Sequence, residues 1–302
     1  LLDGFLLLTL GLFMKVVLAD SMLATTADDI FNAQGPVATI DAWAGVLAFS
    51  GQIFFDFAGY STCAVGVALC LGFVLPENFR YPYAAIGFSD FWRRWHITLS
   101  AWLRDYLYIP LGGNKNGKIK TYINLMITML LGGLWHGANW TFVVWGALHG
   151  FYLWVEKWIQ GFRKRIPPAV IMPEATGAVP VMPKDFKKNN LRNFLLAMVT
   201  FVFINVTWVF FRSPDFSSAW QLLVSMFSSV ADGEALLTTL AIIKVAVIVF
   251  FLVLCHWLMR NTSVIAVANK MPWWLLGIVW AVLLMLLIWS QESSSSFIYF
   301  QF

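Results

Sequence analysis

The chain has 302 residues, of which 60% are hydrophobic and only 12% are charged, and its mean hydropathy is +0.73. Soluble domains carry about 25% charged residues, so this composition excludes a soluble globular protein and indicates a polytopic membrane protein. The formal net charge is +4 and the basic residues lie in loops between apolar segments, which excludes nucleic acid as a partner. The three cysteines lie in apolar segments without the paired spacing of a disulfide framework or a metal site.

Apolar segments long enough to form helices follow one another along the chain and predict an all-α transmembrane fold. They cover residues 1–19, 43–75, 89–106, 122–135, 140–158, 191–211, 235–257 and 273–289. The 43–75 run is longer than one straight span of about 20 residues needs, which leaves a kinked span and a re-entrant segment as alternatives. Residues 89–106 are predicted to form one amphipathic helix with Ser89 as its N-cap and an Asp90–Arg94 pair four residues apart.

Charges in the loops predict the orientation in the membrane. The loops at residues 80–120, 157–192 and 260–270 are rich in Lys and Arg, whereas those at 20–41 and 215–234 are acidic. The positive-inside rule places the basic loops in the cytoplasm, and the acidic loops and the C-terminus outside. On this topology His136 lies at the outer end of its helix.

Residues 88–149 hold three of the four histidines and are predicted to be the catalytic core stretch. Ionisable groups in apolar spans are costly and usually line a site or a pathway. His136 is flanked by Gly132, Gly133 and Gly137, which allow a substrate to approach the ring, and an imidazole can accept a proton from a hydroxyl. The structural alternative is an interhelical histidine hydrogen bonded to a carbonyl.

The other polar residues of this stretch have weaker signals. His96 alone is read as an interfacial anchor, and His149 as a packing residue that could line the site. Arg93, Arg94 and Arg104 could bind phosphate through bidentate hydrogen bonds. Asn139 could hydrogen bond a developing oxyanion, but it is equally suited to cap the following helix.

Familiar soluble-enzyme motifs are missing from the sequence. It contains no GxSxG, Walker loop, HExxH or Cys-His arrangement, so hydrolase, ATPase and metalloprotease functions have no residues to carry them. No metal site or bound cofactor is expected.

Two histidine motifs resemble the membrane-bound O-acyltransferase (MBOAT) family. The run from Asp90 to His96 reads DFWRRWH, and the segment from Leu134 to Trp140 reads LWHGANW. Within this family, the sequence resembles the bacterial alginate O-acetylation branch most clearly, and the resemblance extends to the ending FIYF at residues 297–300. Lipid-modifying relatives usually have Asn or Asp where this chain has His96, so the resemblance favours the cell-envelope polysaccharide branch.

The resemblance implies a fold and an activity. The 302 residues would form a single membrane domain with the MBOAT fold, as the C-terminal portion of a longer protein whose N-terminal spans are absent here. His136 would act as general base and His96 would assist it, with acetyl-CoA as acyl donor. The candidate substrate-binding residues are Asn139, Arg93, Arg94, Trp135 and Arg104. The implied partners are the membrane and a polysaccharide acceptor or a periplasmic SGNH-type acetyltransferase.

The predicted function is therefore that of an O-acyltransferase subunit that passes acetyl toward a secreted, alginate-like polysaccharide at the bacterial inner membrane. A peptidoglycan or teichoic-acid acyl-transfer subunit of the same fold is one alternative. A transporter or channel with histidines along its pathway is another.

Overall fold

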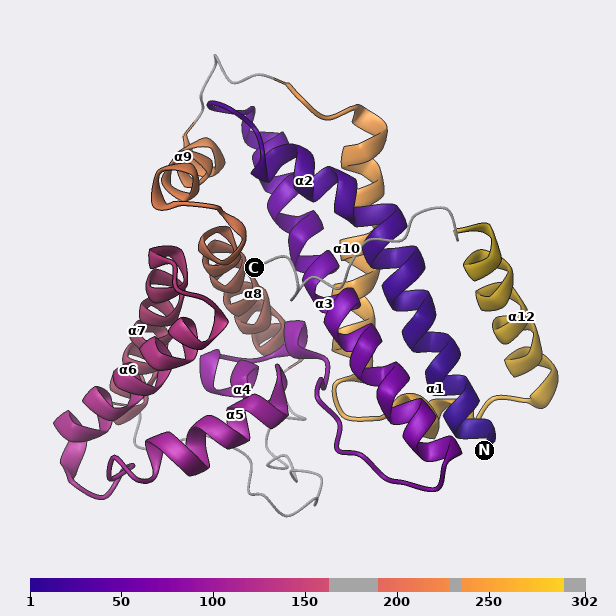
Figure 1. Ribbon diagram of the computed structural model, residues 1–302, viewed down its shortest axis with the longest axis horizontal. Helices are drawn as coiled ribbons and strands as arrows, with labels where there is room; N and C mark the ends of the chain where they lie inside the picture. Colours follow the sequence, from indigo (N-terminus) through magenta and orange to yellow (C-terminus); the bar gives the residue numbers. More distant parts are fainter. Residues whose placement is uncertain (163–189, 229–234, 291–302) are drawn as a thin grey trace. The chain divides into compact units, whose positions relative to one another are not determined.

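The computed structural model describes residues 1–162, 190–228 and 235–290, and these residues form helices without any strand (Figure 1). The all-α prediction is confirmed. Most of the basic segment predicted between residues 157 and 192, and the tail after Ser290, lie outside the described residues. The chain divides into two compact units: unit 1 contains residues 1–77 and 220–302, and unit 2 contains residues 78–219. The prediction of a single domain over 1–302 stays a prediction.

Four of the described helical segments are long and apolar enough to cross a membrane, which supports a multi-pass membrane protein. These segments are Leu2–Phe31, Thr39–Cys70, Leu191–Arg212 and Thr239–Met259. Among the residues that the structure describes, the helices that correspond to the predicted segments 122–135 and 140–158 do form but do not meet this criterion.

Unit 1 is built from long helices that begin at the N-terminus. Its elements are α1 (Leu2–Leu12), η1 (Phe13–Ala24), α2 (Thr25–Phe31), α3 (Thr39–Cys70), α10 (Thr239–Met259), α11 (Val264–Ala268) and α12 (Trp273–Trp289). The first span is longer than predicted because α1, the π-helical η1 and α2 follow one another without a break. Helix α3 is continuous over 32 residues, so the re-entrant alternative for residues 43–75 is wrong, whereas the kinked span stays a prediction.

Helices α1 and α3 pack through small residues. A Cβ atom on Gly11 would lie 2.6 Å from the Gly59 carbonyl oxygen, and one on Gly66 would lie 2.7 Å from the Gly4 carbonyl oxygen. Such spacing brings two backbones into contact, as is common between helices in membranes, where packing replaces the hydrophobic effect. Glycine at these positions therefore sets the distance between the two helices.

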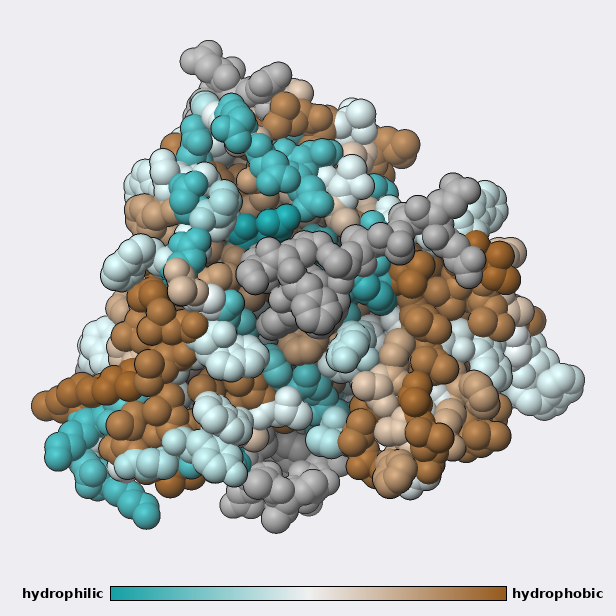
Figure 2. Space-filling model, viewed as in Figure 1, coloured by the Kyte–Doolittle hydropathy of each residue, from teal (hydrophilic) through white to brown (hydrophobic). Residues whose placement is uncertain are grey.

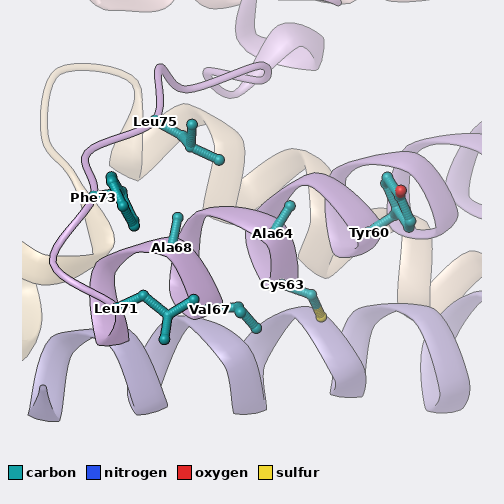
Figure 3. Close-up of a pocket in the computed structure, with 8 residues that line it drawn as sticks. All are labelled: Tyr60, Cys63, Ala64, Val67, Ala68, Leu71, Phe73 and Leu75. Carbon is teal, nitrogen blue, oxygen red and sulfur yellow. The ribbon is translucent and has the colours of Figure 1, made fainter.

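Part of the surface of unit 1 is apolar. Helix α12 has no buried residue, and Figure 2 shows hydrophobic side chains over the part of the surface formed by α1 and α12. A shallow cavity of about 530 Å³ lies against α3, where Phe73 and Leu75 face Ala64 and Ala68 (Figure 3). Apolar surfaces of this extent are expected to face lipid or another protein.

Unit 2 contains all the predicted site residues. Its elements are η2 (Pro82–Ala84), α4 (Phe88–Trp92), α5 (Ile97–Leu103), η3 (Arg104–Tyr108), α6 (Gly117–His136), α7 (Trp140–Phe162) and α8 (Asn190–Arg212). The short α9 (Phe216–Phe227) begins in unit 2 and ends in unit 1. It is amphipathic, because Trp220 is 59% exposed whereas Ala219 and Leu222 are buried.

The predicted helix over residues 89–106 is wrong, because the chain breaks between α4 and α5. At the break His96 adopts a left-handed conformation with φ +44°, and the Arg94 carbonyl accepts a hydrogen bond from the Arg80 N–H at 2.9 Å. The Ile97 N–H donates to the Asn78 carbonyl at 3.0 Å. The preceding segment therefore satisfies backbone groups that a continuous helix would pair internally. Ser89 is also not the N-cap, which is Gly87.

Helices α6 and α7 form a tightly packed hairpin. Added Cβ atoms on Gly133 and Gly146 would collide with the carbonyl oxygens of Phe142 and Met129, respectively. The close approach of the two backbones fixes the end of α6, where His136 is the last residue, against the start of α7.

Candidate active site

His96 sits at the strained corner between α4 and α5. Its φ of +44° is unusual for a residue with a Cβ atom and costs on the order of 1 kcal/mol. The side chain is nevertheless held inside the protein, with a 9% exposed fraction. A strained backbone that persists at a buried histidine is an observation that points to function.

Asn78 fixes the tautomer of His96. The side-chain Oδ1 of Asn78 accepts hydrogen bonds from the Thr98 backbone N–H at 3.2 Å and from the Thr98 hydroxyl at 2.9 Å. A backbone N–H can only donate, so the Asn78 atom must be the oxygen. The same oxygen lies 3.2 Å from His96 Nδ1, which must then carry the proton. The opposite nitrogen, Nε2, is therefore the basic nitrogen of His96.

Burial keeps His96 neutral. Removal from water disfavours the imidazolium and lowers the pKa of His96 from 6.5 to about 4. Near neutral pH the ring is therefore an imidazole that can accept a proton or a hydrogen bond through Nε2.

His136 ends α6 and is surrounded by aromatic rings. Its ring centroid lies 5.0 Å from that of Trp135, 5.1 Å from that of Trp145 on α7 and 5.1 Å from that of Phe211 on α8. Gly137 follows with an extended backbone, and the Phe142 ring lies so close that a Cβ atom on Gly137 would be 2.7 Å from it. Three helices therefore hold the His136 ring, and glycine lets the chain turn immediately after it.

Trp135 brings the two histidines together. The His96 and Trp135 ring centroids are 6.3 Å apart, and the same indole packs against His136. Trp135 itself is 56% exposed. Two imidazoles from different elements thus share contact with one ring that reaches the surface. Their assignment as catalytic residues, and that of Trp135 as a substrate contact, stay predictions.

The structure assigns the three candidate arginines to different environments. Arg94 is buried and bonds the Asp90 carboxylate at 2.9 Å, which confirms the predicted ion pair, and the Arg80 carbonyl at 3.2 Å. Arg104 forms two hydrogen bonds with its neighbour Asp105, at 2.6 and 2.9 Å. Both guanidinium groups therefore have acidic partners within the protein.

Arg93 differs from these two arginines. Its Nε is buried and has no hydrogen-bond partner among the described residues. Near it, on α7, Glu156 accepts hydrogen bonds from the Ser89 N–H and hydroxyl at 2.8 and 3.0 Å. Phosphate binding by the three arginines stays a prediction, and Arg93 is the one with a donor that the described residues leave unused.

Asn139 is part of the turn between α6 and α7. Its Oδ1 accepts a hydrogen bond from the Thr141 N–H at 3.2 Å, and its Nδ2 donates to the Pro214 carbonyl at 2.8 Å. The capping alternative is therefore observed, and the turn is tied to the residues that follow α8. A role in stabilising an oxyanion stays a prediction.

Sequence reasoning missed several residues that support the two histidines. Asn78 had no local signal, because it lies 18 residues before His96 and acts through tertiary contact. Trp145 and Phe211 could have been anticipated only as apolar positions of their helices. His149 was read as a packing residue, and the structure places it fully buried one turn after Trp145.

Comparison with known proteins places this chain in a family. Residues 4–182 match the family model described as MBOAT, the membrane-bound O-acyltransferase family. The chain is 46% identical over 218 residues to the probable alginate O-acetylase AlgI of Pseudomonas syringae pv. tomato, covering 72% of this chain and 37% of that protein. It therefore spans well under half the length of that relative.

The names of two further relatives mention other acceptors. The chain is 35% identical over 320 aligned positions to the peptidoglycan O-acetyltransferase of Helicobacter pylori, covering 99% of this chain and 56% of that protein. It is 33% identical over 162 residues to the teichoic acid D-alanyltransferase of Streptococcus thermophilus, covering 50% of this chain and 39% of that protein. Because the family model matches more than half of its length, the chain belongs to the membrane-bound O-acyltransferase family.

Proposed function

We propose that this chain carries the catalytic centre of an O-acyltransferase that passes acetyl from acetyl-CoA toward a secreted, alginate-like polysaccharide. The observation that carries the proposal is the placement of His96 and His136 against the same Trp135 ring, with the basic Nε2 of His96 defined by Asn78. The family match and the relatives named as O-acetylases support it.

In the proposed chemistry, His136 accepts a proton in the first step and donates it in the second. A ring nitrogen of His136 takes the proton from the acceptor hydroxyl while the oxygen attacks the thioester carbonyl carbon. When the tetrahedral intermediate collapses, the carbon–sulfur bond breaks and the thiolate takes the proton from the His136 imidazolium. His96 would assist as a second site that can hold a proton, at Nε2, and Asn139 is the weaker candidate for the oxyanion.

The distribution of charge in the loops supports a proposed direction of transfer. The donor would approach from the basic, cytoplasmic side of the inner membrane, where Lys and Arg favour the phosphates of coenzyme A. The acceptor would be reached from the outside. It would be the polysaccharide itself or a periplasmic SGNH-type acetyltransferase that completes the transfer.

A peptidoglycan acceptor is the second candidate. The relative named as a peptidoglycan O-acetyltransferase is similar over 99% of this chain, whereas the alginate O-acetylase of Pseudomonas syringae matches 72%. The shared chemistry at His136 would be the same, and only the acceptor would differ.

Complementation of a deletion strain tests the proposal. The full-length gene is supplied intact, as His136→Gln, or as His256→Gln, which changes a buried histidine of α10 outside the site. Ester-linked acetate is then measured on the secreted polysaccharide and on peptidoglycan, relative to the amount of protein in the membrane. Loss of a general base typically lowers the rate by about 100-fold to 10,000-fold, so His136→Gln should restore almost no acetate, whereas His256→Gln should restore it.

The outcome also identifies the acceptor. Acetate restored on the polysaccharide supports the first candidate, and acetate restored only on peptidoglycan supports the second. Full restoration by His136→Gln on either polymer would refute the assignment of His136 as the base.

A further inference from the structure

One face of α7 carries a row of buried polar groups next to the histidine pair. Thr141, Trp145 and His149 are spaced four residues apart and therefore lie on the same side of the helix. The Thr141 hydroxyl, the Trp145 indole nitrogen and both ring nitrogens of His149 are buried without a hydrogen-bond partner among the described residues. Buried polar groups are normally paired, so four such atoms in one row require an explanation.

Trp92 of α4 completes a group of three rings. The His149 ring centroid lies 4.7 Å from that of Trp145 and 5.1 Å from that of Trp92, and the two indoles are 5.8 Å apart. The Trp92 indole nitrogen is also buried without a partner among the described residues. The group offers two indole donors and, on a neutral imidazole, one donor and one acceptor. Water has the matching chemistry, because it can donate and accept at the same time.

Packing alone does not account for an imidazole at this position. The surroundings of His149 are aromatic: besides the two indoles, Phe91 stacks on it at 6.0 Å with an interplanar angle of 14°, and Tyr152 lies at 6.3 Å. A phenyl ring would make the same contacts without leaving two nitrogens unpaired. The imidazole therefore costs stability unless its nitrogens are used.

Trp145 connects this group to the proposed base. Its ring contacts His149 at 4.7 Å and His136 at 5.1 Å. Any hydrogen bond that holds the Trp145 indole in place also holds the surface against which His136 rests.

We propose that His149, Trp92 and Trp145 form a buried polar site that binds water, and that His149 is a positioning residue for His136 acting through Trp145. The inference rests on the proposed function, because it gives His149 a role in the reaction that His136 carries out. It assigns no substrate contact to His149.

Three substitutions in the full-length protein test the role of His149. His149→Phe keeps the ring and removes both nitrogens, His149→Asn keeps polar atoms near the position of Nδ1, and His149→Gln keeps them near that of Nε2. The rate of acetyl transfer, kcat, the KM for acetyl-CoA and the melting temperature are measured for each. His149→Phe should lower kcat by about tenfold to a hundredfold, as misplacement of a catalytic group does, with KM within about twofold.

The melting temperature distinguishes a positioning role from a purely structural one. A purely structural role of His149 would not lower kcat at an unchanged melting temperature. His149→Phe should melt at nearly the same temperature as the unchanged protein, because the phenyl ring keeps the aromatic contacts and replaces the imidazole together with its bound water, an exchange that is nearly neutral when both hydrogen-bonding partners are removed. One of the two amide variants should recover most of kcat and so identify the nitrogen that is used. Trp145→Phe, which removes one donor from the same site, should lower kcat in the same way.

Several results would overturn the proposal. An unchanged kcat in His149→Phe would return His149 to packing, and so would a high-resolution density map of the intact protein without water at the site. A loss of kcat that neither amide variant recovers would show that ring shape, not hydrogen bonding, is what matters. If His136→Gln is inactive while His149→Phe is fully active, the inference fails and the proposed function stands. If His136→Gln is active, the proposed function fails first.

Discussion

Each unit contains a cluster of largely buried ionisable side chains, and the two clusters differ in how these side chains are paired. The Lys15 cluster of unit 1 consists of Lys15, Asp20 and Asp56, and the histidine cluster of unit 2 contains His136 and His149. In unit 1, Lys15 of η1 lies 2.9 Å from the Asp20 carboxylate and 2.5 Å from the Asp56 carboxylate of α3. The side chains are 19%, 5% and 2% exposed, respectively. In unit 2, His136 and His149 are surrounded by aromatic rings, and both nitrogens of His149 have no hydrogen-bond partner among the described residues.

This difference in pairing distinguishes buried polar groups that stabilise the fold from those that are available for a reaction. Charges that neutralise one another inside a span hold helices together and leave little capacity for a substrate. The His149 imidazole, packed against rings, has hydrogen-bonding capacity that the described side chains do not use. We therefore expect substitutions in the Lys15 cluster to change stability and substitutions in the histidine cluster to change rate.

Removal of Lys15 should produce the largest change in stability. Lys15→Met leaves the Asp20 and Asp56 carboxylates buried without their cation, and breaking a buried ion pair costs about 3–5 kcal/mol. The loss of stability is measured as the change in the free energy of unfolding in detergent or lipid. Adding Asp20→Asn and Asp56→Asn should recover part of the loss. The exposed Lys270→Met serves as control and should change stability by less than about 0.5 kcal/mol. A similar effect of both lysine variants would mean that the cluster does not stabilise unit 1.

The next effect is the pH dependence of stability, and it belongs to His96, the buried histidine at the corner between α4 and α5. The pKa of His96 falls from 6.5 in the unfolded chain to about 4 in the folded protein. Between these values the unfolded state binds the proton more readily, so the contribution of His96 is complete above about pH 6.5 and is lost as the pH falls through about 4. The shift corresponds to about 3 kcal/mol at most.

The measurement is the difference in unfolding free energy between the unchanged protein and His96→Asn, taken from pH 7 to pH 4. Asparagine tolerates the left-handed backbone, so this variant removes the titrating group with little change in strain. The unchanged protein should lose more stability over this range. Parallel curves would show that His96 is not held neutral by burial.

Gly59 tests the packing that supports the Lys15 cluster and should have the smallest effect. A Cβ atom there would lie 2.8 Å from the Gly11 carbonyl oxygen and 3.0 Å from the backbone nitrogen of Lys15. Gly59→Ala should therefore destabilise by about 1–3 kcal/mol. Gly277→Ala is the matched control, because nothing lies within 4 Å of its added Cβ atom in α12. It should stabilise by about 0.5–1 kcal/mol, and equal effects of the two changes would contradict the close packing of α1 and α3.

The regular helices were the part of the fold most accessible from the sequence. Runs of apolar residues predicted α8, α10 and α12 within a few residues, because a helix in an apolar setting satisfies its own backbone. The break at His96 was not predictable from periodicity. The pattern of residues 89–106 fits a helix, but hydrogen bonds from residues 78–80 replace the helical ones at that point.

The candidate site was predicted through its motifs and only in part through its geometry. The resemblance brought His96 and His136 to attention, but a spacing of 40 residues does not say that both rings meet at Trp135. Asn78 and Trp145 escaped notice because their roles depend on contacts between distant elements. The spacing predicted the Asp90–Arg94 ion pair, but the burial of Arg94 depends on tertiary contacts that the sequence does not show.

The order in which the ribosome delivers the chain adds a constraint of a different kind. Unit 1 is discontinuous, since residues 1–77 need residues 220–302 to complete it. The Asp41 carboxylate in α3 accepts hydrogen bonds from the Leu236 and Leu237 N–H groups at 2.7 and 3.0 Å, 195 and 196 residues away along the chain. At about 5–20 residues per second, α3 waits on the order of 10–40 s for these donors. Unit 2 is contiguous and can therefore assemble during synthesis before residues 220–302 are made.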